Sequence, residues 1–182
     1  MMDTQVTKMI ERKGLCLLYQ EGEKKFYSYT PTVFRPLYTH FEPMTLSRRV
    51  RLLLEWLGKN SYKVFYLEIN GVLVGHCVAA PGGRRLRRST PEDIVLGPYF
   101  VDPCYRGKGY AKELVRLTLQ KGGMTYDRAY DYIKKDNHPS RKATLACGFR
   151  HCGELNIQGF FHKLVECPGG EYDIFLYDPS MR

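Results

Sequence analysis

Hydrophobic residues in this chain fall mainly into short runs that end at glycine, proline or charged turns. Such runs are typical of β-strands. In two stretches the apolar residues instead recur every three or four positions, as on one face of an amphipathic helix. The pattern predicts strands over residues 15–20, 25–29, 62–69, 72–80, 94–101, 128–133, 149–157 and 172–177. It predicts helices from residue 45 or 47 to 59 and over 108–120, and Pro139 and Gly148 bound a third, short helix over 139–147.

Glycines mark several of these boundaries. The Asn70-Gly71 pair is the preferred filling of a two-residue hairpin turn, so we expect the strands on either side of it to pair. The pair Gly122-Gly123 ends the second helix, and Gly148 ends the third. We therefore expect a mixed α/β domain of the α+β kind.

Composition bounds the kind of molecule that these elements can build. The 182 residues match one domain over 1–182, since compact domains run to about 100–200 residues. A hydrophobic fraction of 43% can fill one core, and no apolar run approaches the roughly 20 residues of a membrane span. Residues 1–12 lack the pattern of a secretory signal. We expect a soluble, cytoplasmic protein that does not bind membranes.

Cysteine usage and charge narrow the chemistry only slightly. Six cysteines are present without a Cys-x-x-Cys pair or a matching histidine spacing, so we expect no disulfide framework and no metal site. The formal net charge of +9 attracts anions but does not choose among them. Nucleic acid, an acidic lipid surface, an anionic acceptor and nucleotide phosphates would all be favoured. A local feature must decide between these ligands.

The clearest chemistry lies in residues 101–111, where a predicted strand leads into a predicted helix. The N–H groups in the first turn of a helix lack partners within it, and the positive end of the helix dipole lies there, so phosphate oxygens bind well. Gly107 and Gly109 permit a tight turn and close approach of the phosphate. Arg106 and Lys108 add positive charge. The segment predicts a pyrophosphate site, with a solvated basic turn as the alternative.

Two motifs in this chain resemble those of the GNAT acetyltransferases. Arg-x-x-Gly-x-Ala over 106–111 is similar to the Gln/Arg-x-x-Gly-x-Gly/Ala motif of that family, and it follows a strand ending in Val-x-Pro, as is usual there. Asn-x-x-Ser over 137–140 and the Gly-Phe pair at 148–149 resemble a second element of the family. A P-loop or a dinucleotide-binding turn would need further glycines or a Gly-Lys-Ser/Thr end, which the segment lacks.

The resemblance is strongest over 62–177 and poor over 1–60. It implies a single GNAT-fold domain with a mixed, mostly antiparallel sheet flanked by helices and splayed between strands 4 and 5, here those over 94–101 and 128–133. Acetyl-CoA would enter that wedge as acyl donor, without a metal. By this likeness the residues that bind it are Phe100, Val101, Arg106, Gly107, Lys108, Gly109, Tyr110, Ala111, Asn137 and Ser140.

By the same likeness, the acetyl thioester would lie near Tyr99, and an amine would attack it directly. The reaction needs a neutral amine, a stabilised carbonyl oxygen and a proton for the departing thiolate. The family's glutamate base is missing, because the strand offers Val95, Gly97, Pro98 and Tyr99 at the relevant positions. The tyrosine that usually acts as the acid is replaced by Thr144.

Other residues can take over these two roles. His76 is a candidate base because a histidine titrates near neutrality. The catalytic candidates are Tyr99, His76 and Asp93, with Glu92 and Glu68 as further bases and Tyr132 and Tyr110 as further acids. Water or the attacking amine could instead protonate the thiolate.

The expected function is N-acetylation of a primary amine on a small molecule, such as an amino sugar or amino acid derivative. Acetylation of a protein N-terminus or lysine, and a non-catalytic coenzyme A-binding module, remain alternatives. A nucleic-acid-binding protein is a third class, but no recognition motif supports it, so we expect no nucleic-acid partner. The loop over 81–92 carries Arg84, Arg85, Arg87 and Arg88, which either hold an acidic acceptor or are solvated. A homodimer is left open.

Overall fold

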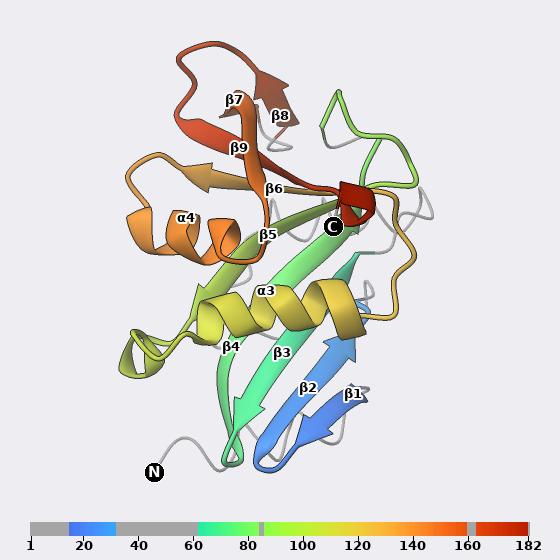
Figure 1. Ribbon diagram of the computed structural model, residues 1–182, viewed down its shortest axis with the longest axis vertical. Coiled ribbons are helices and arrows are strands. Elements are labelled where there is room, and N and C mark those ends of the chain that lie inside the picture. Colours follow the sequence, from blue (N-terminus) through green and yellow to red (C-terminus); the bar gives the residue numbers. More distant parts are fainter. Residues whose placement is uncertain (1–14, 32–61, 84–85, 160–162, 182) are drawn as a thin grey trace.

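The computed structural model describes residues 15–31, 62–83, 86–159 and 163–181. These residues form a nine-stranded sheet in the order β1-β2-β3-β4-β5-β6-β9-β7-β8, with two α-helices in front of one face (Figure 1). The helix predicted from residue 45 or 47 to 59 lies outside the described residues. None of the described helices is long and apolar enough to cross a membrane.

Five strands, each antiparallel to the next, make up the first part of the sheet. They are β1 (Cys16–Glu21), β2 (Lys24–Tyr29), β3 (Lys63–Ile69), β4 (Val72–Pro81) and β5 (Ile94–Val101). The turn between β3 and β4 holds Asn70 and Gly71 at φ values of 51° and 75°, as a two-residue hairpin turn of this kind requires. The predicted hairpin is therefore confirmed.

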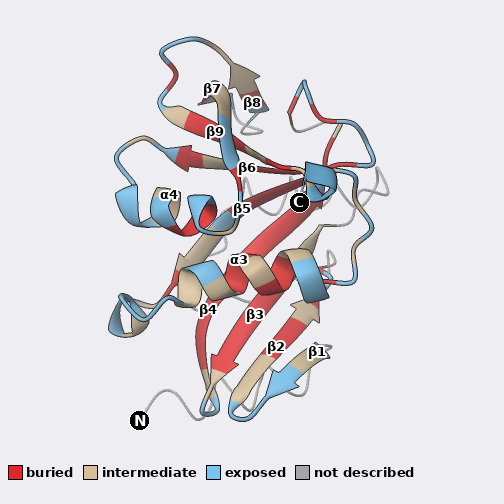
Figure 2. Ribbon diagram, viewed as in Figure 1, coloured by how far each residue is buried: buried red, intermediate tan, exposed pale blue. Residues whose placement is uncertain are grey.

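Two helices cover one face of the sheet. Helix α3 (Tyr110–Lys121) buries Leu114, Val115 and Leu117 in the same core cluster as Phe65 of β3. The shorter helix α4 (His138–Leu145) lies beside α3 and contacts β6. Figure 2 shows the buried residues concentrated in the central strands and on the inner side of α3. Burial of this apolar side fixes the helix, and hence its N-terminus, relative to β5.

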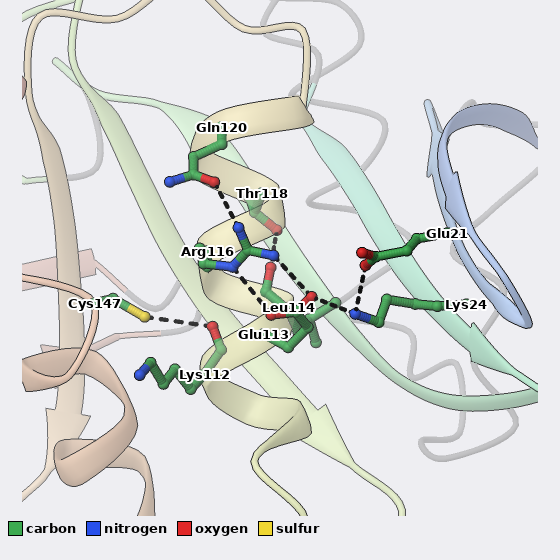
Figure 3. Close-up of polar contacts among 9 residues, drawn as sticks. All are labelled: Glu21, Lys24, Lys112, Glu113, Leu114, Arg116, Thr118, Gln120 and Cys147. Carbon is green, nitrogen blue, oxygen red and sulfur yellow. Dashed lines mark hydrogen bonds and ion pairs between the residues drawn. The ribbon is translucent and has the colours of Figure 1, made fainter.

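Polar contacts on the outer side tie α3 to the sheet as well. Lys24 of β2 lies 2.9 Å from Glu113 of α3 and 3.2 Å from Glu21, which brings β2 to the helix (Figure 3). Within the helix, Arg116 donates to Glu113 and to Gln120. The network links the helix to a strand that is distant in sequence.

The second part of the sheet contains β6 (Ala129–Lys134), β9 (Tyr172–Tyr177), β7 (Arg150–Gln158) and β8 (Lys163–Glu166). Strand β8 was not predicted, because four residues are too few for a periodic pattern. Its place is set by pairing with β7 and by Leu164, which is buried in a cluster with Leu86 and Leu155. The sequence analysis had placed only two strands after α4, so β8 corrects that expectation.

A wedge opens between β5 and β6. These are the only parallel neighbours in the described sheet, and they pair at two positions alone, Ile94 with Ala129 and Val95 with Tyr130. Both strands then continue, β5 to Val101 and β6 to Lys134, without further pairing between them, and Figure 1 shows them diverging. The expected splay between the strands over 94–101 and 128–133 is confirmed.

Candidate functional site

The open end of the wedge meets the N-terminus of α3. A short 3-10 helix, η1 (Pro103–Tyr105), follows β5 and is capped by Asp102, which accepts a hydrogen bond from the N–H of Cys104 at 2.9 Å. Arg106 turns back towards the strand, and its Nε donates to the carbonyl of Val101 at 3.0 Å. Its guanidinium lies 5.4 Å from the ring centroid of Phe100.

Two glycines shape the entry to α3. Gly107 and Gly109 both have a φ of 80°, in the left-handed region that residues with a Cβ rarely adopt. Gly109 is the N-cap residue, and no side chain caps the helix. A Cβ added at either glycine would meet no atom within 4 Å. The first turn of α3 therefore has no side-chain cap and open space beside its glycines, which suits the binding of phosphate oxygens.

Basic residues lie beside these N–H groups. Lys108 is exposed, with its ammonium 5.5 Å from the ring centroid of Tyr105. At the start of α4, Asn137 is exposed, and its Oδ1 accepts a hydrogen bond from the N–H of Ser140 at 3.2 Å. The Asn137 side chain thus caps α4, while its amide nitrogen can still donate to a ligand.

The backbone of β5 presents alternate residues to the wedge. The N–H of Asp102 donates to Val74 of β4 at 2.9 Å, so the strand alternation directs the backbone of Val101 away from β4. The carbonyl of Phe100 instead points towards β4, because a Cβ built on Gly75 of β4 would lie 2.4 Å from its oxygen. Tyr99 and Val101 are therefore the wedge-facing residues at the open end.

A chain of polar side chains crosses the wedge below α4. The hydroxyl of Tyr99 on β5 donates to the carbonyl of Ser140 at 3.0 Å and lies 3.1 Å from Oγ1 of Thr144. Thr144 in turn lies 2.7 Å from Oδ2 of Asp131 on β6. Thr144 and Asp131 are both 0% exposed. Burial raises the pKa of Asp131 to about 6, and hydrogen bonds from Thr144 and from the backbone of Tyr132 limit the rise.

The same surroundings act on the Tyr99 phenol. Burial, followed by the nearby carboxyl of Asp131, raises its pKa above the ordinary value. Asp131 was not among the predicted site residues, and Thr144 was noted only as the replacement for the family's usual tyrosine. The available signal was an aspartate inside the apolar strand Ala-Tyr-Asp-Tyr-Ile, where a carboxyl group is unusual unless a partner is at hand.

The three predicted catalytic residues do not come together. His76 pairs with Phe100 across β4 and β5, and both side chains lie on the face opposite Tyr99. His76 is 1% exposed, with ring centroids of Tyr66 and Phe100 at 6.4 and 6.1 Å. The further candidate Glu68 accepts from Tyr27 and lies 3.5 Å from Lys25.

Asp93 lies at the closed end of the wedge. Arg128 binds both of its carboxylate oxygens at 3.0 Å, and the N–H of Thr90 donates to it at 2.8 Å. Burial alone would raise the pKa of Asp93, but these hydrogen bonds and the guanidinium charge hold it below its ordinary value. The arrangement closes the wedge and does not favour a role for Asp93 as a base.

The arginine-rich loop is partly committed to structure. Arg88 pairs with Glu166 of β8 and donates to the carbonyl of Cys152 at 2.7 Å. Arg87 is exposed, and Arg84 and Arg85 lie outside the described residues. Arg88 is therefore not available to hold an acceptor in this arrangement.

Two buried or partly buried cysteines near the wedge are unsuited to covalent catalysis. Burial raises the pKa of Cys77, which pairs with Tyr99 across β4 and β5, to about 12. Burial likewise raises the pKa of Cys147, near α3, to about 11. Both stay thiols near neutral pH and are weak nucleophiles. No group of three potential metal ligands occurs in the described ranges.

Comparison with known proteins identifies the family to which the chain belongs. A model of the acetyltransferase (GNAT) family matches residues 30–149, so it includes part of the N-terminal segment that the sequence motifs left unassigned. No curated protein sequence matches the chain.

Solved structures share the fold at low sequence identity. An uncharacterized protein from Bacillus halodurans is 14% identical and superposes with a TM-score of 0.62, covering 92% of this chain and 91% of its own. The ribosomal-protein-S5-alanine acetyltransferase from Vibrio fischeri is 16% identical, with a TM-score of 0.53 and coverage of 88% and 95%. The spermidine N-acetyltransferase from Vibrio cholerae, solved with CoA and spermine, is 16% identical, with a TM-score of 0.53 and coverage of 77% and 80%.

Proposed function

Since the chain belongs to the acetyltransferase (GNAT) family and is an acyltransferase that uses acetyl-CoA, we propose that it acetylates a primary amine on a small-molecule acceptor by direct attack. The observation that carries this proposal is the wedge that opens after two β5–β6 pairs, with the uncapped N-terminus of α3 at its mouth. A polyanion at the helix and a thioester in the wedge fit this geometry.

We place the pyrophosphate of acetyl-CoA on the N–H groups of residues 106–111, with Lys108 beside it. The pantetheine arm would run along the unpaired edge of β5, where the backbone of Val101 faces the wedge. This orientation favours Val101 and Tyr99 over the predicted Phe100 as partners of the arm. Asn137 and Ser140 would border it from α4.

In the proposed reaction the amine nitrogen attacks the thioester carbonyl, the C–S bond breaks, and the thiolate takes a proton. Tyr99 is the nearest acid, because its hydroxyl lies within the wedge between β5 and α4. For the amine proton we retain His76, whose ring lies beside Phe100 on the face of the sheet opposite Tyr99. Asp93 and Glu68 are held by cations and drop out of the proposal.

The test combines binding and turnover. Calorimetry with acetyl-CoA should give saturable binding, and Gly109→Asp should abolish it, because a carboxylate at the N-cap repels phosphate and a side chain at a φ of 80° strains the turn. Gly123→Asp is the matched control: it has a φ of 61° and open space, but lies past the other end of α3. Equal binding by the two variants would refute the pyrophosphate site.

Thiol release from acetyl-CoA with a panel of amines then identifies the acceptor class. Release with amino sugars, amino acids or polyamines supports the proposal. Release only with peptides that carry a free N-terminus or a lysine would redirect it to protein acetylation. Binding without any thiol release would indicate a non-catalytic coenzyme A module.

A further inference from the structure

Three side chains, those of Tyr99, Thr144 and Asp131, are linked by polar contacts. Of these, only Tyr99 has a role in the proposed reaction. They make three short contacts in a row, from the Ser140 carbonyl to Tyr99, from Tyr99 to Thr144, and from Thr144 to Asp131. The contacts join β5, α4 and β6, so they span the wedge that the thioester is proposed to enter.

The number of hydrogens available to these three contacts favours one protonation state of Asp131. If Asp131 is a carboxylate, Thr144 donates to its Oδ2 and Tyr99 donates to the Ser140 carbonyl, so the oxygens of Tyr99 and Thr144 face each other at 3.1 Å without a hydrogen between them. If Asp131 carries a proton, three hydrogens serve three contacts. Asp131 then donates to Thr144, Thr144 to Tyr99, and Tyr99 to the Ser140 carbonyl. The neutral acid is the form that satisfies every contact.

The surroundings of Asp131 agree with a neutral carboxyl group. Its second oxygen, Oδ1, is buried and receives no hydrogen bond from the described part of the chain. A Cβ built on Gly97, where β5 bulges, would lie 3.7 Å from that oxygen, so it faces β5 across the wedge. No cationic partner of Asp131 is found among the described residues, whereas an ionised buried carboxylate needs one.

We propose that Asp131 is a positioning residue that holds the proton for the departing thiolate and passes it to Tyr99 through Thr144. The proposal rests on the proposed acetyl transfer. As the C–S bond breaks, Tyr99 gives its hydroxyl proton to the thiolate sulfur and receives one from Thr144, which receives one from Asp131. The thiolate becomes a thiol and the carboxylic acid a carboxylate. Solvent returns a proton to Asp131 after release of coenzyme A.

A pair of substitutions at Thr144 tests the relay. Thr144→Val keeps the size of the side chain and removes the hydroxyl, whereas Thr144→Ser keeps the hydroxyl. Loss of general acid catalysis usually costs about 10²- to 10⁴-fold, so we expect turnover to fall at least about 10-fold in Thr144→Val and to recover in Thr144→Ser. Acetyl-CoA affinity by calorimetry should stay within about twofold in both, because neither change touches the proposed pyrophosphate site.

The pH profile separates a relay from a packing defect. In the wild type, turnover should fall as pH rises and Asp131 loses its proton, whereas the Thr144→Val profile should lack this limb. Wild-type turnover in Thr144→Val, an unchanged pH profile, or equal loss in Thr144→Ser would each overturn the relay. These outcomes are distinct from failure of the proposed function itself, which would appear as a wild-type protein that binds acetyl-CoA without thiol release or does not bind it.

Discussion

The two ends of the wedge each bury an aspartate, and the two carboxyl groups behave in opposite ways. At the closed end Asp93 is 1% exposed and faces the guanidinium of Arg128, and its pKa is lowered. At the open end Asp131 is 0% exposed and meets a neutral hydroxyl, and burial raises its pKa to about 6. Both side chains are buried in the folded protein, so their partners decide the sign of the shift: the Thr90 N–H and the Arg128 guanidinium stabilise the charged form of Asp93, whereas no cationic partner of Asp131 is found among the described residues.

This difference suits the closed end of the wedge to a structural role and the open end to proton transfer. A carboxylate paired with arginine cannot readily take or give a proton near neutral pH, but it can hold two strands together. A carboxyl group without a cationic partner gives up a proton at moderate cost and suits proton transfer. The strands therefore stay paired at the closed end, and a titratable group lies where the chemistry is proposed.

The largest effect on stability is expected from removing Arg128. Arg128→Ala leaves the Asp93 carboxylate buried without its cation, which typically costs about 3–5 kcal/mol in the free energy of unfolding. Because the Arg128 side chain is 36% exposed, we expect the lower end of that range. Urea unfolding at pH 7.5 measures the loss.

The matched control for this change is Arg87→Ala, which removes an exposed arginine from the preceding loop. It should change stability by less than about 0.5 kcal/mol. The pKa of Asp93 is lowered in the folded protein, so its contribution is present above its unfolded pKa and is lost as pH falls through the folded value. The gap between Arg128→Ala and the wild type should therefore narrow in acid, and a gap that widens in acid would contradict the ion-pair account.

At the open end we expect a substitution to stabilise the protein. A carboxyl group whose pKa rises from 3.8 to about 6 on folding contributes nothing at low pH, where both states are protonated, and opposes folding increasingly as pH rises from about 4 to 6 and fully above pH 6. The difference corresponds to about 3 kcal/mol at one pKa unit per 1.36 kcal/mol, as an upper bound. Asp131→Asn removes this penalty and can still donate to Thr144, so it should unfold at higher urea concentration than the wild type at pH 7.5.

The pH dependence of the gain is the decisive measurement. The gain in the free energy of unfolding should grow as pH rises between about 4 and 6. Below about pH 4 it should vanish, because Asp131 is then protonated in both the folded and the unfolded protein. The same variant should lose turnover, since an amide has no acidic proton to pass on. A variant that is destabilised at pH 7.5 would show that the folded protein holds Asp131 as a stabilised carboxylate. That result would contradict the neutral carboxyl group inferred from the contacts of Tyr99, Thr144 and Asp131.

The contrast between the ends also shows what sequence could and could not predict. Strand periodicity, the Asn70-Gly71 turn and the glycines before α3 are local signals, and they located β3, β4, β5 and the turn that we propose binds phosphate. The roles of Asp93 and Asp131 depend on register instead. Asp93 was a catalytic candidate because it directly precedes β5. The parallel pairing of Ile94 with Ala129 places it at the closed end of the wedge, away from Tyr99. Asp131 was missed because only the fold brings it to Thr144.

The smallest expected effect concerns Asn137, whose side chain caps α4 and is also predicted to bind the cofactor. Asn137→Ala removes the acceptor for the Ser140 N–H and should cost about 1 kcal/mol of stability, whereas Asn137→Ser keeps a capping oxygen and should cost less. Thermal denaturation measures this difference. The Michaelis constant for acetyl-CoA separates the two roles, because serine cannot replace the amide donor. If the constant rises in both variants, Asn137 contacts the cofactor at the open end; if it follows stability and recovers in Asn137→Ser, the residue serves only to begin the helix that carries Thr144.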